Sequence, residues 1–282
     1  MRPLIGDLHT HTSASDGLLS SSELLYFARD KGLEIVGITD HDSISGLEEA
    51  LKLGPEMGLT IVPGVELSTE NGKKEIHILG YYIEWHNEKF LLFLKLMRQD
   101  RERRNIRIIK RLQELGFEIS IEDVEKEVHG EAIGRPHIAA TLVRKGYVPS
   151  FEIAFSTLLK RGKPAYVPRN KISPYKAVEV ILSVGGVPVL AHPGLSKVDE
   201  LIPDLVTAGL QGIEVYYPFH DELTTKHYKE IANKYNLIIT GGSDFHGQKD
   251  NSHADLGSIR IGEEEFIKLK RRAEKIKECI KV

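Results

Sequence analysis

The stretch GDLHTHTSASDG, at residues 6–17, places His9 and His11 two positions apart and Asp16 five positions after the second histidine. On a β-strand, the side chains of residues i and i+2 point to the same face, so the two imidazoles can reach a common ion. A pair of this kind also occurs by chance in proteins that bind no metal. The remaining ligands of a metal site must therefore come from elsewhere in the chain.

Similar short runs of apolar and β-branched residues recur along the chain, and most of them end in residue types that bind metals. They lie at residues 34–42, 59–66, 75–83, 187–194, 212–218 and 237–247. Helical patterns separate most of the runs, for example at residues 21–32 and 173–186, where Ser or Pro favours a helix start and Gly a helix end. Seven strands alternating with helices predict an α/β fold with a mostly parallel sheet or barrel.

One junction departs from this alternation of strands and helices. Only the ten residues LSTENGKKEI separate Glu66 from His77, which is too few for a crossover helix, and they centre on the turn-forming pair Asn71-Gly72. We therefore expect an antiparallel hairpin here. In such a hairpin Glu66 and His77 can face the same ion.

The strand pattern disappears between residues 91 and 170, where the sequence predicts helices with many basic positions. We interpret this segment as an inserted helical subdomain, and residues 1–90 and 171–282 as the barrel that it interrupts. Four arginines, Arg101, Arg103, Arg104 and Arg107, lie close together in the insertion. They fit either a solvated helix face with acidic partners or a surface that grips polyanions.

The composition of the 282-residue chain is that of an ordinary globular protein, with 41% hydrophobic and 28% charged residues. A formal net charge of −3 gives no general argument for a nucleic-acid partner. The single cysteine, Cys279, excludes an internal disulfide framework and a zinc site built from several thiolates, so any metal must bind to His, Asp or Glu. No apolar run reaches the roughly 20 residues of a membrane span, and a cytoplasmic location without membrane association is expected.

Polar residues gather at the predicted strand ends, which meet on one face of a barrel of parallel strands. They are His9, His11, Asp16, Asp40, His41, Glu66, His77, His192, Asp244 and His246. Imidazole and carboxylate ligands suit zinc, manganese and iron. With Asp40 left outside, six histidines and three carboxylates predict a site for two or three divalent ions.

The order of these motifs resembles the PHP (polymerase and histidinol phosphatase) superfamily over the barrel part of the chain, to about residue 250. The matching elements are H-x-H, TDHD, a Glu, a His, AHPG and SDFHG, and they align in the same order. Within that superfamily the chain is most similar to the small enzymes of the 3',5'-nucleoside bisphosphate phosphatase type. The similarity includes the helical insertion, GRPHIA at residues 134–139 and the strand end VYYPFH.

The resemblance implies a distorted (β/α)7 barrel of the PHP type with a trinuclear metal centre. One ion would be bound by His9, His11 and Asp244, a second by His77 and His192 with Glu66 bridging the two, and a third by Asp16, His41 and His246. A metal-activated hydroxide would then attack the phosphorus of a phosphate monoester. Three divalent ions, three carboxylates and one hydroxide leave about two positive charges, which favours a dianionic phosphate over a neutral substrate.

Four further residues are candidates for supporting roles. We expect Asp40 to orient a ligand histidine rather than to bind metal itself. His220 is either the acid that protonates the leaving group or a surface residue at a helix start. Arg135 and His137 can clamp a second phosphate, or Arg135 can pair within the insertion.

The function that these features favour is hydrolysis of a phosphate monoester in a small nucleotide, such as conversion of a nucleoside 3',5'-bisphosphate to a nucleoside monophosphate and phosphate. The same centre fits a 5'-3' exonuclease acting on short RNA, and a histidinol-phosphate phosphatase. A non-catalytic PHP module that stabilises a partner is a weaker alternative, because all nine ligand positions are filled. So is a nucleic-acid-binding module driven by the arginines, whose binding should depend strongly on salt. The expected partner is a small phosphorylated substrate, with no obligate protein partner.

Overall fold

A single sheet of seven strands forms the centre of the protein, and the order of the strands in space follows their order in the sequence. The structure is a computed structural model that describes residues 5–127, 133–168, 172–247 and 254–280. The strands are β1 (Gly6–Thr10), β2 (Ile35–Ile38), β3 (Thr60–Asn71), β4 (Lys74–Tyr81), β5 (Val187–Leu190), β6 (Gly212–Tyr216) and β7 (Ile238–Gly241). All seven coincide with predicted apolar runs.

The sheet curls into a nearly closed barrel. Strands β1 to β3 run parallel to one another, and so do β5 to β7, whereas β4 runs antiparallel to both of its neighbours. The segment after β7 returns to β1, where the N–H of His11 donates to the carbonyl of Phe245 at 2.9 Å and the N–H of Asp244 donates to the carbonyl of His9 at 2.9 Å. The predicted α/β barrel is confirmed, with β4 as its one reversed strand.

The predicted hairpin is formed by β3 and β4. Its register pairs Ser68 with His77 and Glu66 with Leu79, and the turn lies between Asn71 and Lys74. Alternate residues of a strand share a face, so Glu66 and His77 point to the same side of the hairpin. The antiparallel arrangement therefore brings a carboxylate and an imidazole together across neighbouring strands.

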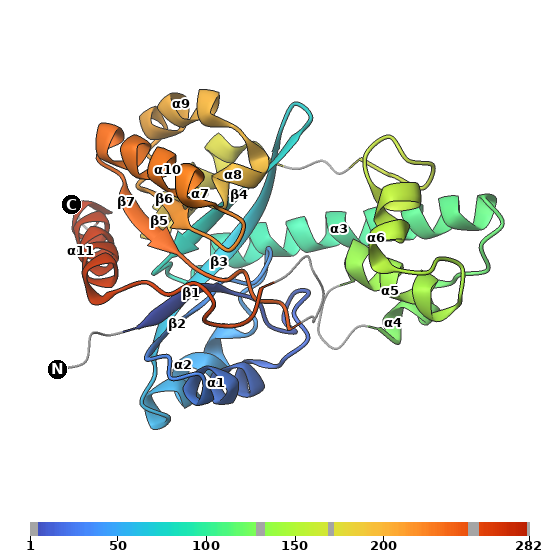
Figure 1. Cartoon of the computed structure of the whole chain (residues 1–282), viewed down its shortest axis with the longest axis horizontal. Helices are drawn as coiled ribbons and strands as arrows, with labels where there is room; N and C mark the ends of the chain where they lie inside the picture. Colours follow the sequence, from blue (N-terminus) through green and yellow to red (C-terminus); the bar gives the residue numbers. More distant parts are fainter. Residues whose placement is uncertain (1–4, 128–132, 169–171, 248–253, 281–282) are drawn as a thin grey trace.

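Helices connect and cover the strands. They are α1 (Ser21–Asp30), α2 (Leu47–Glu56), α3 (Glu88–Glu114), α4 (Ile121–Glu125), α5 (Arg135–Arg144), α6 (Phe151–Ala154), α7 (Pro174–Ser183), α8 (Pro193–Ser196), α9 (Ile202–Thr207), α10 (Glu222–Tyr235) and α11 (Glu263–Ile280), with short η segments at Phe155–Leu159 and Asp199–Leu201. In Figure 1, α1 and α2 lie on one side of the sheet and α7, α9 and α10 on the other. Within the described ranges, no helix is both long and apolar enough to cross a lipid bilayer.

Local sequence explains where the first barrel helices begin and end. Ser20 caps α1 through a capping box with Glu23, and Ser173 caps α7 with Pro174 as its first residue. Gly32 and Gly185 follow these two helices with φ angles of 74° and 70°, a backbone region that side chains other than glycine rarely adopt. These residues set the helix ends and return the chain to the next strand.

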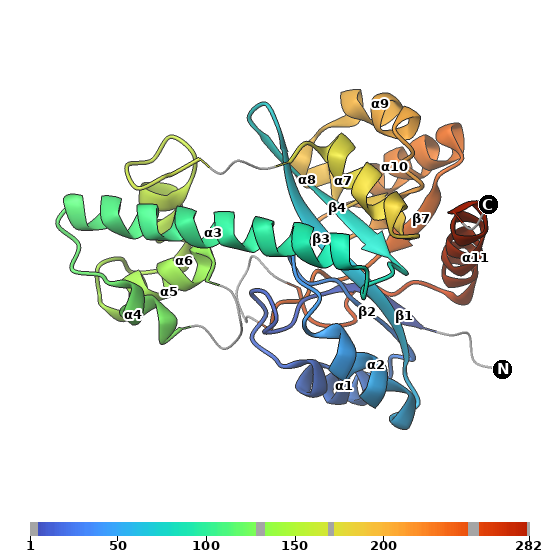
Figure 2. The same ribbon diagram turned by 180° about the vertical axis from the view of Figure 1, so that it is seen from behind.

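The helix α3 leaves the barrel and continues into the insertion without a break, as Figure 2 shows from behind. Its first half contributes Phe90 and Leu94 to the core of the barrel, while its second half contributes Ile108 and Leu112 to a separate hydrophobic cluster with α4, α5 and α6. The predicted boundary at residue 91 lies inside this helix. The division into residues 1–90, 91–170 and 171–282 stays a prediction.

Candidate metal centre

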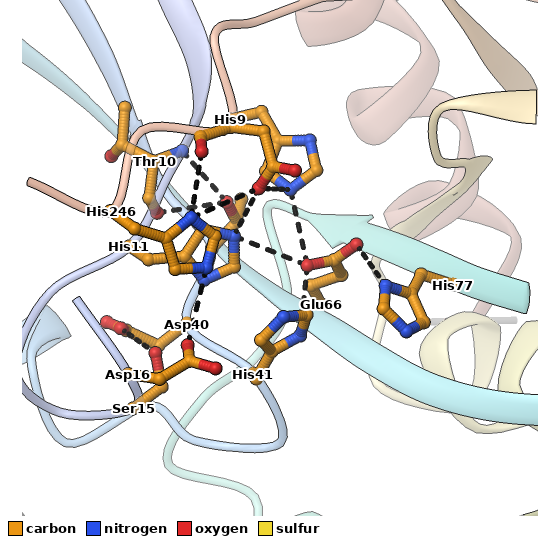
Figure 3. Close-up of polar contacts among 12 residues, drawn as sticks. His9, Thr10, His11, Ser15, Asp16, Asp40, His41, Glu66, His77 and His246 are labelled. Carbon is orange, nitrogen blue, oxygen red and sulfur yellow. Dashed lines mark hydrogen bonds and ion pairs between the residues drawn. The ribbon is translucent and has the colours of Figure 1, made fainter. Parts of the chain in front are cut away.

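The barrel brings all nine predicted metal ligands together at one end, although each strand delivers only one or two of them. Figure 3 labels seven of them, His9, His11, Asp16, His41, Glu66, His77 and His246. His9 lies in β1 and His11 just after it, His41 follows β2, Glu66 and His77 lie on the hairpin, His192 follows β5, and Asp244 and His246 follow β7, with Asp16 in the loop after β1. None of the nine side chains is more than 17% exposed. The cluster is therefore an interior feature of the fold.

Glu66 lies at the centre of the cluster, as the contacts drawn in Figure 3 show. Its carboxylate is completely buried and has five imidazole nitrogens within 3.3 Å. They belong to His9 (3.2 Å), His11 (3.3 Å), His41 (3.0 Å), His77 (2.9 Å) and His192 (3.0 Å). Glu66 belongs to two of the groups of side chains that could hold an ion, and its role as a bridge between two ions stays a prediction.

The other two carboxylates extend the cluster on the side of β1. Asp244 Oδ1 lies 3.3 Å from His9 Nε2 and 3.0 Å from His11 Nε2, and Asp16 Oδ1 lies 3.4 Å from His246 Nε2. Three groups of side chains have ligand atoms close enough for one ion each. They are His9, His11, Glu66 and Asp244; His11, Asp16, His41 and His246; and His41, Glu66 and His77. These groups overlap, and the predicted division of the nine ligands among three ions stays a prediction.

Unsatisfied polar atoms indicate that the cluster fits metal ions. Buried atoms without a hydrogen-bond partner among the described residues include His9 Nε2, both ring nitrogens of His11, His41 Nδ1, Asp16 Oδ1, Glu66 Oε2 and Asp244 Oδ1. An unpaired buried polar atom is costly, and native proteins rarely keep several in one place without a ligand. Lone pairs on imidazole and carboxylate that face a common space are the donor set that a divalent transition metal needs.

The electrostatics of the cluster point the same way. Burial by itself would raise the pKa of Glu66, but the charges of the surrounding histidines outweigh burial and hold that pKa well below its usual range. Burial by itself would also lower the pKa of His11 and of His77. Asp244 and Glu66 outweigh burial at His11 and raise its pKa to about 10, and Glu66 does the same at His77 and raises its pKa to about 9. Without metal, the carboxylates of Asp16, Glu66 and Asp244 stay ionised and the imidazoles of His11 and His77 hold protons. A bound metal takes the place of those protons.

Asp40 holds the loop between the first ligands. Its carboxylate accepts hydrogen bonds from the Thr12 N–H (2.7 Å), the Thr12 hydroxyl (2.7 Å) and the Ser15 hydroxyl (2.6 Å). These bonds go to the segment between His11 and Asp16, so Asp40 fixes the position of both ligands through the backbone and side chains of that loop. The expectation that Asp40 orients a ligand histidine stays a prediction. Any catalytic role of Asp40 stays a prediction.

His220 is buried beside the loop that carries His192. One ring nitrogen, Nδ1, lies 2.9 Å from the carbonyl of Val215, and the other, Nε2, accepts the N–H of Gly194 at 3.1 Å. Both nitrogens thus have backbone partners, and burial lowers the pKa of the ring. The arrangement identifies His220 as a support of the loop around Gly194. Its proposed role as leaving-group acid stays a prediction.

Two residues near the centre were not singled out by the sequence. Glu214 on β6 is completely buried and contacts the rings or backbone of two ligand histidines, and the Tyr217 hydroxyl donates to Asp244 Oδ2 at 3.1 Å. Both occur in the run GIEVYYP, where nothing in a single sequence separates a buried acid from a solvent-facing one. Only their position opposite the ligands reveals them.

Close backbone packing joins β1 to the segment that carries Asp244. A Cβ atom added to Gly242 would lie 2.4 Å from the backbone nitrogen and Cβ of His9. We expect Gly242→Ala to push these segments apart, to destabilise the protein by about 1–3 kcal/mol and to weaken metal binding. Thermal unfolding and metal titration test this, with Gly262→Ala, which faces only the flexible end of Glu265, as the control. Unchanged stability and affinity in Gly242→Ala would contradict it.

A cavity of about 720 Å³ opens from the ligand cluster toward the insertion. The barrel contributes Asp16, His41, His77, Asp244 and His246 to its lining, and the insertion contributes Arg101, Arg104, Arg135 and Lys160. The Arg101 guanidinium pairs with the buried Asp42, next to His41, at 2.9 Å. The Arg135 guanidinium lies 3.5 Å from Glu75. His137, in contrast, accepts the N–H of Gly134 at 2.9 Å through Nδ1 at the start of α5 and is not among the lining residues. Of the two predicted clamp residues, only Arg135 faces the cavity.

The PHP domain family matches residues 7–147 of the chain. A phosphoribosyl 1,2-cyclic phosphate 1,2-diphosphodiesterase from Eggerthella lenta is 33% identical over 87% of this chain and 95% of its own length. The chain belongs to the PHP family. The resemblance read from the motifs of this PHP protein is thereby confirmed.

Further relatives define the chemistry of the PHP protein. A 5'-3' exoribonuclease from Haemophilus influenzae is 32% identical over 85% of this chain and 89% of its own length. A 3',5'-nucleoside bisphosphate phosphatase from Chromobacterium violaceum is 32% identical over 88% of this chain and 91% of its own length. The structure of an amidohydrolase from Chromobacterium violaceum, solved with bound sulfate and no metal, aligns with a TM-score of 0.86 at 30% identity over 95% of this chain and 96% of that one. The PHP protein is a metal-dependent phosphoesterase, which sets aside a non-catalytic module.

Proposed function

We propose that this PHP phosphoesterase hydrolyses a phosphate monoester of a small nucleotide that carries a second phosphate, such as a nucleoside 3',5'-bisphosphate. The observation that carries the proposal is one cavity whose lining contains both predicted metal ligands and three arginines of the insertion. Its volume of about 720 Å³ lies in the range typical of small-ligand sites. One phosphate would bind at the metal centre, and the second would pair with the arginines that the insertion contributes to the cavity.

The residues of the chain would act mainly by placing charge. Manganese, iron or zinc ions, two or three of them, would supply a nucleophile from water and positive charge around the phosphate. The nine ligands fix where those charges lie, and Asp40 and Tyr217 hold the ligand-bearing segments Thr12–Asp16 and Asp244 in place. Arg135 and Arg104 would fix the far end of the substrate, since a guanidinium offers a phosphate two parallel donors.

A 5'-3' exonuclease activity on short RNA is the second candidate, and a specific observation favours it as well. A second cavity of about 450 Å³ shares Arg104, Arg135 and Lys160 with the first and adds Lys73 and Arg161 beyond them. This row of cations would accommodate a longer phosphate chain. Histidinol phosphate, with a single phosphate, leaves the arginines of the cavity without a second phosphate to bind.

The products formed from a panel of substrates in the presence of manganese separate these candidates. The panel is adenosine 3',5'-bisphosphate, AMP, histidinol phosphate, phosphoribosyl 1,2-cyclic phosphate and a short 5'-phosphorylated RNA, with the products identified. The proposal expects the highest kcat/KM for the bisphosphate, with AMP as product. A higher kcat/KM for the RNA, with stepwise release of mononucleotides, would replace the proposal with the exonuclease, and a higher value for histidinol phosphate would overturn both.

A substitution of Arg135 tests whether the arginines of the cavity recognise the second phosphate. We expect Arg135→Ala to lower kcat/KM for adenosine 3',5'-bisphosphate by about 10- to 100-fold, the equivalent of one hydrogen-bonded charge, and to change little for a nucleoside 3'-monophosphate. Arg103→Ala is the matched control, because Arg103 is exposed on the same insertion and, among the residues that the structure describes, donates to Gln99 of its own helix. Equal losses for both substrates would show that Arg135 does not recognise the second phosphate.

A further inference from the structure

Glu214 is a buried carboxylate that touches two metal ligands from different strands. It lies on β6 with no exposed surface. One oxygen, Oε1, lies 2.9 Å from Nδ1 of His9, and the other, Oε2, accepts the backbone N–H of His192 at 2.8 Å. The rings of these two histidines stack at a centroid distance of 5.8 Å. A single side chain therefore links the ligand at β1 to the ligand that follows β5.

The contact with His9 fixes which ring nitrogen carries the proton. An ionised carboxylate only accepts hydrogen bonds, so Nδ1 of His9 must be the donor. In the neutral ring that binds a metal, the lone pair is then on the opposite nitrogen, Nε2, which faces Glu66 Oε2 at 3.2 Å and Asp244 Oδ1 at 3.3 Å. It also has no hydrogen-bond partner. Glu214 thus presents His9 in the tautomer that a metal ion requires.

The contact of Glu214 with His192 stabilises an unfavourable backbone conformation at His192. His192 has φ 27° and ψ 57°, a left-handed conformation that residues other than glycine seldom adopt, and Pro193 follows it. The bond from its N–H to Glu214, together with the Gly194 to His220 bond, ties down this turn on both sides of Pro193. The turn directs the imidazole of His192 toward Glu66, where Nε2 lies 3.0 Å from Oε1.

We propose that Glu214 is a positioning residue that sets the geometry of His9 and His192 together, and that it controls the affinity of the metal positions beside Glu66 to which these two histidines contribute. Glu214 is not itself a ligand, because both of its oxygens are engaged by the histidines. The group His11, Asp16, His41 and His246 includes neither His9 nor His192, so its affinity for metal should change less. The inference concerns metal binding and does not depend on the identity of the phosphate ester.

Two variants separate the acceptor role of Glu214 from its size and charge. In Glu214→Gln the amide keeps the volume but offers a single acceptor, so one of the two donors loses its partner or His9 must take the wrong tautomer. In Glu214→Asp the charge remains, but the shorter side chain cannot reach both partners. Tyr81→Phe is the matched control, since it removes one buried hydrogen bond, to the carbonyl of Leu8, from the same barrel interior without touching a ligand.

Zinc titration of the metal-free proteins against a competing chelator gives the decisive readout. We expect Glu214→Gln and Glu214→Asp to weaken the zinc sites that include His9 or His192 by about 10- to 100-fold and to change the affinity of the remaining site less. Tyr81→Phe should bind zinc like the wild type. Affinities that are unchanged at every site, or weakened equally at all of them, would overturn the proposal.

A measurement on the wild type alone tests the same proposal if a variant does not fold. Long-range ¹⁵N–¹H correlation spectra of histidine-labelled, zinc-loaded protein report which nitrogen of each ring carries a proton. The proposal expects His9 to be protonated at Nδ1 and to bind zinc through Nε2. A spectrum with His9 protonated at Nε2, or bound to zinc through Nδ1, would overturn it.

Discussion

Replacing Glu66 with glutamine is expected to lower the rate of phosphate-ester hydrolysis by at least about 100-fold, because loss of a supporting residue around a metal already costs 10- to 100-fold and Glu66 is itself a candidate ligand. Its carboxylate is fully buried among five histidines, the nearest of them His77 at 2.9 Å. The amide would place an NH₂ group where the structure has an oxygen facing imidazole nitrogens. It would also remove the negative charge that lies at the junction of two candidate ion positions.

Steady-state phosphate release on wild-type and variant protein, each supplied with manganese, measures this effect. Glu70→Gln is the matched control, because Glu70 lies on the same strand four residues away and pairs with Arg161 rather than with the cluster. Circular dichroism and thermal unfolding establish that both variants are folded. Full activity in Glu66→Gln would show that this carboxylate holds no catalytic metal.

Removal of metal is expected to have an equally large effect. Dialysis against a chelator should lower hydrolysis at least about 100-fold, and manganese, iron or zinc should restore it. The affinity of the metal-free protein for the added metal should also increase as the pH rises from about 6 to 9. The reason is that His11 and His77 have raised pKa values without metal and must lose their protons to bind it. Activity that survives chelation, or reactivation that strengthens toward acid pH, would contradict a site in which metal ions displace protons.

Much of the centre was predictable because ligand residues sit where strands end. Runs such as VPVLAHPG and LIITGGSDFHG predict a buried strand followed by ligand residues. Parallel strands place the residues that follow them on the same face of a barrel. The hairpin was equally clear, since Asn71-Gly72 lies within a connection too short for a helix. Local patterns therefore predicted the nine-residue cluster, although its division among ions is a matter of three-dimensional distances.

The residues that the sequence missed act through long-range contacts. Glu214 meets His9 across 205 positions of sequence, and no periodicity in GIEVYYP indicates that its side chain points into the barrel. For Asp40 the sequence predicts support of a ligand histidine, and only the structure shows that its carboxylate accepts hydrogen bonds from Thr12 and Ser15. The antiparallel pairing of β4 with β5 was hidden for a similar reason, because the insertion separates the two strands along the chain.

The most direct test of the account is the metal content of the protein itself. Elemental analysis should be made on wild-type protein and on Glu66→Gln, both purified without chelator and then offered manganese, iron and zinc. The account predicts about two to three tightly held ions per wild-type chain and at least about one fewer in the variant. A wild-type chain that retains fewer than about 0.2 ions after this treatment would contradict the assignment of the nine residues as a metal centre.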